Sequence, residues 1–308
     1  MSVDRYLEVL PSSPVELDFR WYEDIRAELL LRAVRSRRLV LDVGCGRGEV
    51  LLGLSGTIEC GTGIDLSHEE TETASRRARE RGVTNLTFIQ ADAGALPFGE
   101  NRYDTVLCLG DVLSCGNLYT RWEKALQEMR RVLRPGGGSA FHCMNWDWEY
   151  RSSPHWVFFQ RGRDSGYQFV RDERSADGVE TARDYAVVAG TPLAEWIASK
   201  EWPAGSGDYQ TALTVAEKEP FPEAWIRYTG TSRHRNFTAD GLAQALRSSG
   251  FGEVWVTAFG ATYDIASKAG VLGEVEPVRR RLAQAEAEVV WQQRQGSGPW
   301  LFATARKV

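Results

Sequence analysis

The sequence lacks the patterns that mark membrane, secreted and nucleic-acid-binding proteins. No apolar run approaches the roughly 20 residues that a transmembrane helix needs. The amino-terminal stretch MSVDRYLEVLPSSP does not have the basic and then apolar pattern of a signal peptide. The formal net charge is −5, so there is no basic excess to neutralise phosphates. We therefore expect a cytoplasmic protein with neither a membrane nor a nucleic-acid partner.

Cysteine is also scarce, with five in 308 residues, an odd number without a CxxC pair. This usage fits reduced thiols better than a disulfide framework or a zinc site. His142 and Cys143 are neighbours on a predicted strand, so their side chains point to opposite faces and do not readily bind one ion. Only Asp147 and Glu149 lie nearby as carboxylates for magnesium. We predict no metal site.

Strand-like and helix-like segments alternate through the first half of the chain. Leu39 to Val43 is an almost continuous apolar run, as expected for a strand buried on both faces of a parallel sheet. Further strands are predicted in 57–67, 85–92, 102–111 and 138–144, and helices in 18–34, 49–54, 68–82 and 121–133. This alternation predicts an α/β fold with a doubly wound, Rossmann-like parallel sheet.

Three successive strands of this predicted sheet end in groups suited to a nucleotide-like ligand. Gly44, Gly46 and Gly48 follow the first strand as GxGxG, which differs from the GxGxxG of dinucleotide sites. Asp65 ends the second strand, where a carboxylate can accept both hydroxyls of a ribose. Asp92 ends the third, placed to accept from an adenine amino group. A tight turn, a helix cap and a turn aspartate would explain each alone, but their succession favours a ligand site.

The ordered motifs LVLDVGCGRGEV, GIDLS, FIQADAGALPF, RYDTVLCL and RVLRPGG resemble those of class I S-adenosylmethionine-dependent methyltransferases. The resemblance covers about residues 38–144. It implies a seven-stranded sheet of order 3-2-1-4-5-7-6 with the last strand antiparallel, and S-adenosylmethionine as the cofactor. VWVTAFG and PWLFATARKV near the carboxyl end would then be the sixth and seventh strands.

The resemblance also implies roles for particular residues. The methionine part of the cofactor would lie along Gly44, Gly46 and Gly48, with Asp42 supporting the turn. Asp65 would hold the ribose diol. Contacts to the adenine would come from Leu66, Asp92, Ala93 and Leu109.

We expect four parts in the chain: a helical lid (1–36), the cofactor-binding half of the core (37–145), an inserted substrate-binding region (146–235), and the rest of the core (236–308). Strands are predicted within the insertion at 182–190, 208–219 and 225–235, so it would be antiparallel. A helix over 275–291 places Val278, Leu282, Ala285 and Val289 on one face, as expected for packing.

Methyl transfer mainly needs the acceptor to be held in line with the methyl group, and it needs a base only if the acceptor arrives protonated. The candidates for a proton acceptor are His142, His234 and Tyr22. Each has a structural alternative: a packed core histidine, a solvated strand face, and core packing beside Trp21.

The aromatic segment HCMNWDWEY, residues 142–150, opens the insertion and is best interpreted as a pocket wall. The residues we expect at the substrate are Asp111, Asn145, Trp146, Trp148 and Arg233. CLGDVL and FHCMNWDWEY are also loosely similar to the glycine N-methyltransferase group.

We therefore predict methylation of a small molecule, most simply at the nitrogen of an amine or amino-acid-like metabolite. O- or C-methylation of an aromatic natural product and a non-catalytic cofactor-binding module are the alternatives. An NAD-dependent dehydrogenase is disfavoured because GxGxxG is missing. A homodimer is one assembly that the sequence leaves open.

Overall fold

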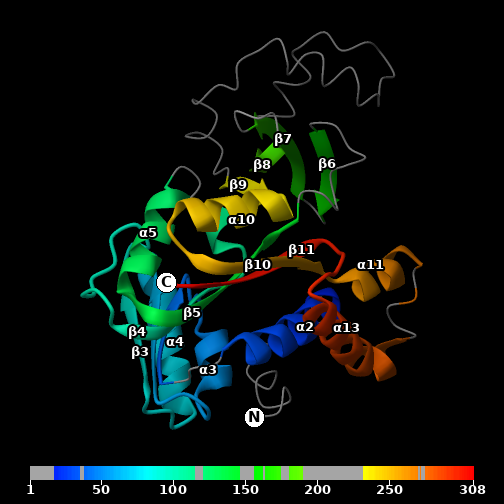
Figure 1. Ribbon diagram of the computed structural model, residues 1–308. Helices are drawn as coiled ribbons and strands as arrows, with labels where there is room; N and C mark the ends of the chain where they lie inside the picture. Colours follow the sequence, from blue (N-terminus) through cyan, green and yellow to red (C-terminus); the bar gives the residue numbers. More distant parts are fainter. Residues whose placement is uncertain are drawn as a thin grey trace.

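The computed structural model describes residues 17–34, 38–114, 121–145, 156–161, 164–174, 180–189, 232–269, 271 and 275–308. Its centre is a seven-stranded sheet with helices on both faces (Figure 1). Across the sheet the strands are β3 (Leu86–Gln90), β2 (Cys60–Asp65), β1 (Leu39–Val43), β4 (Tyr103–Cys108), β5 (Leu133–Met144), β11 (Trp300–Arg306) and β10 (Gly252–Phe259).

Strands β1 to β5 pair in parallel, whereas β11 runs antiparallel to both of its neighbours, β5 and β10. In chain order this is 3-2-1-4-5-7-6 with the last strand antiparallel. The predicted fold class is confirmed.

Helices pack on both faces because single strands contribute apolar side chains to each face. Val40 of β1 belongs to one hydrophobic cluster, while Leu41 and Val43 belong to the other. The helices are α2 (Leu17–Ala33), α3 (Glu49–Leu54), α4 (His68–Glu80), α5 (Trp122–Val132), α10 (Ala239–Ser248), α11 (Ala261–Lys268) and α13 (Arg279–Gln293). α5 and α10 contribute to the cluster on one face, and α2, α3 and α13 to the cluster on the other (Figure 1). No helix in the described part of the chain is long and apolar enough to span a bilayer.

Helix α2 buries the stripe that its sequence predicts. Trp21, Ile25 and Leu29 are buried at helical spacing against the sheet. On β5, Ala140 contacts the α2 cluster while Phe141 and Cys143 lie in the α5 and α10 cluster. His142 contacts Tyr22 of α2, so it points away from Cys143, as the alternation predicts.

The predicted packing face of the helix over 275–291 is wrong for Val278, Ala285 and Val289, whereas Leu282 is partly buried against the cluster under α2. Val278 and Val289 are 42% and 49% exposed, and the buried residues of α13 are Ala283, Ala287 and Val290. α13 packs against α2 through this face. Alanine allows two helix backbones to approach closely, so Ala283 and Ala287 suit this contact, while Leu282 and Trp291 are partly buried against the same cluster.

A second, antiparallel sheet lies in the inserted region. It contains β6 (Trp156–Arg161), β7 (Asp164–Arg174), β8 (Glu180–Ala189) and β9 (Ser232–Phe237), in that order. The strand predicted over 182–190 corresponds to β8, and the one predicted over 225–235 overlaps β9. The prediction over 208–219 lies outside the described residues. An isolated bridge between Asn145 and Phe237 joins the end of β5 to the end of β9. The four-part division of the chain stays a prediction.

Candidate functional site

The turn after β1 contains three glycines with left-handed backbones, at φ 73° for Gly44, 50° for Gly46 and 77° for Gly48. A Cβ on Gly44 would lie 2.4 Å from Val112, and one on Gly48 would lie 2.8 Å from Phe88, so protein packing occupies both positions. A Cβ on Gly46 would meet no atom closer than 3.9 Å. Gly46 is therefore the glycine of this turn whose missing side chain leaves open space.

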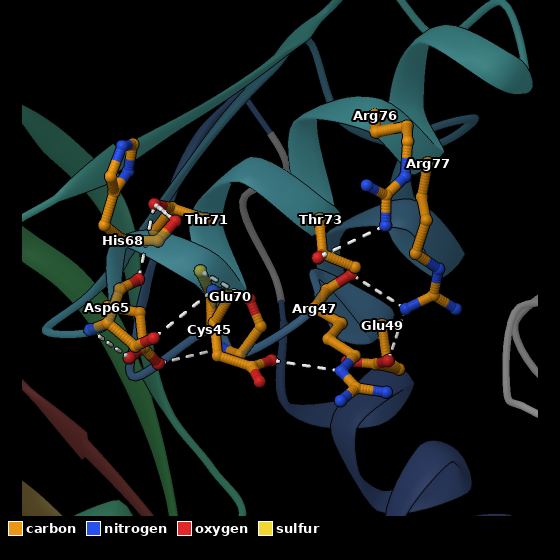
Figure 2. Close-up of polar contacts among 12 residues, drawn as sticks. Cys45, Arg47, Glu49, Asp65, His68, Glu70, Thr71, Thr73, Arg76 and Arg77 are labelled. Carbon is orange, nitrogen blue, oxygen red and sulfur yellow. Dashed lines mark hydrogen bonds and ion pairs between the residues drawn. The ribbon is translucent and has the colours of Figure 1, made fainter.

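Asp65, at the end of β2, holds the turn in place. Its Oδ2 accepts from the Gly46 N–H at 3.0 Å, and its Oδ1 accepts from the Ser67 N–H at 3.0 Å. Figure 2 shows Asp65 beside the turn and the first residues of α4. A carboxylate has about four acceptor sites, so an oxygen that receives one backbone bond can still accept from a ligand. Asp65 is thus both an anchor of the turn and a candidate ligand contact.

Ion pairs hold the outer side of the same turn to α4 (Figure 2). Arg77 donates to the Arg47 carbonyl at 2.8 Å and pairs with Glu49. Arg47 in turn pairs with Glu70 at 3.3 Å. The sequence reasoning missed these residues, although arginines and glutamates recur along predicted α4. The glycine turn is therefore bound to both β2 and α4, which limits its movement.

Asp92 lies just after β3, close to the position expected for adenine recognition. Its Oδ1 accepts from the Gly94 N–H at 2.7 Å, and its Oδ2 pairs with Arg121 at 2.9 Å. The Gly94 N–H, and secondarily Arg121, hold the pKa of Asp92 below its ordinary value, while burial acts in the opposite direction. Asp92 is therefore an ionised acceptor at neutral pH.

A buried group of charges lies next to the glycine turn. Asp42 is 1% exposed, and burial raises its pKa to about 7, with the Arg26 guanidinium acting against that rise. Its Oδ2 has no hydrogen-bond partner in the described part of the chain. Arg26 of α2 is itself buried and lies over the Tyr22 ring, with its Cζ 5.1 Å from the ring centroid. The sequence reasoning missed Arg26. Its position four residues after Tyr22, on the same helix face, is a signal that would have found it.

Two predicted catalytic residues, Tyr22 and His142, lie in contact. The Tyr22 hydroxyl and His142 Nδ1 are 3.2 Å apart in a buried hydrogen bond. Phe259 packs against both rings, and Trp300 packs against Tyr22. Burial, reinforced by Arg26, holds the pKa of His142 well below its ordinary value of 6.5, so the imidazole is neutral. Among the described residues, no hydrogen-bond partner lies at its Nε2.

The other residues predicted at the cofactor and substrate differ in their exposure and backbone conformation. Leu66 is 49% exposed beside Asp65, and Ala93 is half-buried beside Asp92. Leu109 is buried in the cluster under α2. Asp111 follows Gly110 at the tip of β4 and adopts φ 67°, a left-handed conformation uncommon outside glycine.

The predicted substrate contacts are described only in part. Asn145 is buried, and its side chain donates to the Gly298 carbonyl at 2.8 Å, so it anchors the segment that leads into β11. The backbones of Arg233 and His234 lie in β9, paired with β8. Trp146 and Trp148 lie outside the described residues. The substrate roles of these residues stay predictions.

Comparison with known proteins gives a family match over the first half of the core. Residues 40–137 match the family model described as "Methyltransferase domain". A fatty-acid O-methyltransferase of Mycolicibacterium smegmatis is 32% identical over 168 residues, covering 51% of this chain and 57% of that protein. A ubiquinone/menaquinone biosynthesis C-methyltransferase of Azotobacter vinelandii is 35% identical over 116 residues, covering 36% of this chain and 44% of that protein. The chain thus spans about half the length of these curated relatives.

A solved structure shares the fold beyond the matched segment. An S-adenosylmethionine-dependent methyltransferase from Clostridium acetobutylicum superposes with a TM-score of 0.52 and 11% identity, covering 94% of this chain and 91% of that one. The strand order, the glycine turn after β1 and the match over residues 40–137 agree with one another. Over residues 40–137 the chain is similar to the methyltransferase domain family, and its sheet has the fold of class I S-adenosylmethionine-dependent methyltransferases.

Proposed function

We propose that this protein transfers a methyl group from S-adenosylmethionine to a small-molecule acceptor. The observation that carries the proposal is the open side of Gly46. The turn is anchored by Asp65, and both neighbouring glycines are packed against Val112 and Phe88, yet the space at Gly46 stays free. A ligand can therefore approach the backbone at one defined point at the carboxyl edge of the sheet, where this fold binds its cofactor.

The residues around this point match the chemical groups of the cofactor. Asp65 offers carboxylate oxygens to the ribose hydroxyls, and Asp92 offers an ionised acceptor to the adenine amino group. Arg26, which also pairs with Glu23, is a buried cation near Asp42 and suits the carboxylate of the methionine part, and Asp42, which ionises near pH 7, suits its ammonium. The bound cofactor supplies an electrophilic methyl group on a sulfonium centre. The protein supplies position, and it excludes water around that group.

For the acceptor we propose a nitrogen of an amine or amino-acid-like metabolite. Such a nitrogen arrives protonated at neutral pH, and its deprotonation costs on the order of 4–5 kcal/mol for a pKa of about 10.4. A base is therefore useful, and it should be neutral rather than anionic, because a carboxylate would stabilise the ammonium. His142 is the neutral candidate among the described residues, and the lowered pKa that keeps it neutral also makes it a weaker proton acceptor than an ordinary histidine. In the tautomer whose Nδ1–H donates to Tyr22, its Nε2 is a free acceptor.

The alternative acceptors are an oxygen or a carbon. The two relatives above carry names for O-methylation and C-methylation, which supports this alternative for the shared domain. A non-catalytic cofactor-binding module is the third possibility.

The first experiment is titration calorimetry with S-adenosylhomocysteine, S-adenosylmethionine and NAD. We expect saturable binding of S-adenosylhomocysteine and S-adenosylmethionine, and no binding of NAD. The informative variant is Gly46→Ala, because its Cβ would occupy the open space at the turn. The matched control is Gly82→Ala, whose glycine also has a positive φ (64°) and has no atom within 4 Å of a built Cβ.

Both substitutions strain a left-handed backbone, at a cost on the order of 1 kcal/mol. Only Gly46→Ala should also weaken S-adenosylhomocysteine binding, by about tenfold or more for a displaced ligand contact. Equal binding by the two variants, or a preference of the parent protein for NAD, would refute the assignment of this site.

The second experiment identifies the acceptor class. The protein is incubated with methyl-labelled S-adenosylmethionine and separate panels of amines, phenols, carboxylic acids and activated aromatic carbons. Label transfer to amines supports the nitrogen proposal, and transfer confined to another panel replaces it. Cofactor binding without transfer to any panel favours the non-catalytic module.

A further inference from the structure

Helix α5 holds the loop that carries Asp92. Glu128 accepts from the Leu96 N–H at 2.8 Å, and Arg131 donates to the carbonyls of Phe98 at 2.7 Å and Leu96 at 3.1 Å. Glu128 and Arg131 also pair with each other at 2.8 Å. These partly buried contacts fix the loop between β3 and β4 independently of its first residues.

Arg121 makes a different kind of contact from the cap of the same helix. It donates from Nη1 to Oδ2 of Asp92 at 2.9 Å, while Oδ1 is taken by the Gly94 N–H. A Cβ on residue 94 would lie 2.6 Å from Arg121 Nη2, so glycine at this position leaves room for the guanidinium. Since Glu128 and Arg131 already hold the loop, the contact of Arg121 acts on the carboxylate rather than on the backbone.

The effect on Asp92 is orientational and electrostatic. With one oxygen bonded to the Gly94 N–H and the other to Arg121, the carboxylate plane cannot rotate freely. The same two donors favour the charged form, in agreement with the lowered pKa of Asp92. Each oxygen keeps acceptor capacity for a ligand, because a carboxylate offers about four acceptor sites.

We propose that Arg121 is a positioning residue for adenine recognition, which orients the Asp92 carboxylate as the acceptor for the amino group of the cofactor. This proposal rests on the proposed function, because it takes the adenine of S-adenosylmethionine as the ligand at Asp92. Arg121 belongs to neither the glycine turn nor the expected set of cofactor contacts. Its action is indirect, through the oxygen that it bonds.

The test is a double-mutant cycle on S-adenosylhomocysteine affinity, measured by calorimetry with Arg121→Gln, Asp92→Asn and the double variant. Arg121→Gln alone should weaken binding about two- to fivefold, the range expected for a partly exposed ion pair. In the Asp92→Asn background the same substitution should have no effect. Arg121→Lys should recover most of the affinity, because the contact uses a single donor. Lys124→Gln removes an equal charge from an exposed position on α5 and should leave binding unchanged.

Two further measurements separate this role from general loss of fold or charge. When S-adenosylhomocysteine affinity is measured against pH, Arg121→Gln should lose affinity at a higher pH than the parent on acidification, because Asp92 then protonates more readily. It should also reduce the preference for S-adenosylhomocysteine over S-inosylhomocysteine, which lacks the amino group. An equal loss in both Asp92 backgrounds, or no loss in either, would overturn the proposal. If the parent protein does not bind S-adenosylhomocysteine, the proposed function falls as well.

Discussion

The burial of Asp42 makes a specific prediction about the pH dependence of stability. The carboxyl group is enclosed, and its pKa is raised from 3.8 to about 7 in the folded protein. Between these values the unfolded chain releases the proton while the folded protein keeps it. The free energy of unfolding should therefore fall as the pH rises from about 4 to 7. At 1.36 kcal/mol for each pKa unit, the shift corresponds to about 4 kcal/mol at pH 8.

Asp42→Asn tests this reasoning because it keeps the shape of the side chain and removes its titration. Urea unfolding of both proteins should be measured from pH 4 to pH 8. The difference in unfolding free energy, variant minus parent, should become more positive with rising pH by up to about 4 kcal/mol. The absolute offset also contains the cost of burying an amide, so the pH-dependent part is the informative quantity.

The comparison isolates Asp42, because every other titrating group is common to both proteins. The same unfolding measurements in saturating S-adenosylhomocysteine provide a second test. If the cofactor's ammonium lies near Asp42, bound ligand stabilises the charged form and should flatten the pH dependence of the parent protein. A parent–variant difference that does not change with pH would refute the assigned burial of this charge.

Four other substitutions have expected outcomes. The parent protein should lose stability as the pH falls below about 6.5, because the lowered pKa of His142 means that the unfolded state binds this proton more readily. His142→Phe should remove that loss. An equal loss of unfolding free energy below about pH 6.5 in both proteins, measured by urea unfolding, would contradict this. Glu286→Gln should lower the unfolding free energy by about 2–3 kcal/mol, since Glu286 accepts from three backbone N–H groups at the start of α11. Glu288→Gln, at a half-exposed ion pair, is the matched control and should cost below about 1 kcal/mol when both variants are compared by urea unfolding. Asp65→Ala should weaken S-adenosylhomocysteine binding at least about tenfold, because charge-assisted bonds of about 1.5–3 kcal/mol each are lost; unchanged calorimetric affinity would exclude the ribose contact.

The framework of the cofactor site was predictable because it depends on local signals. β1 is apolar on both faces, so the segment Leu39–Val43 had to lie inside a parallel sheet, and the glycines after it marked its carboxyl end. Asp65 is the last residue of β2 and Asp92 lies two residues after β3, so the strand assignments gave their approximate places. The direction of His142 followed from simple alternation along β5.

The helix over 275–291 shows where such reasoning stops. The spacing of its apolar residues suggested one packing face, but the buried residues of α13 are Ala283, Ala287 and Val290. Periodicity describes one helix, whereas the buried face depends on how closely a partner helix approaches. No local pattern in the sequence contains that information.

By itself, the sequence determined the fold class and the row of groups at the ends of β1, β2 and β3, because strand propensity and turn chemistry act over a few residues. The tertiary structure alone decided which distant groups meet. It brought Tyr22 of α2 to His142 of β5, Arg26 to the neighbourhood of Asp42, and Arg121 to Asp92. It also decided that Gly46 has open space while its neighbours do not. Contacts across the fold depend on the packing of whole elements, and the pKa values follow from the burial that this packing creates.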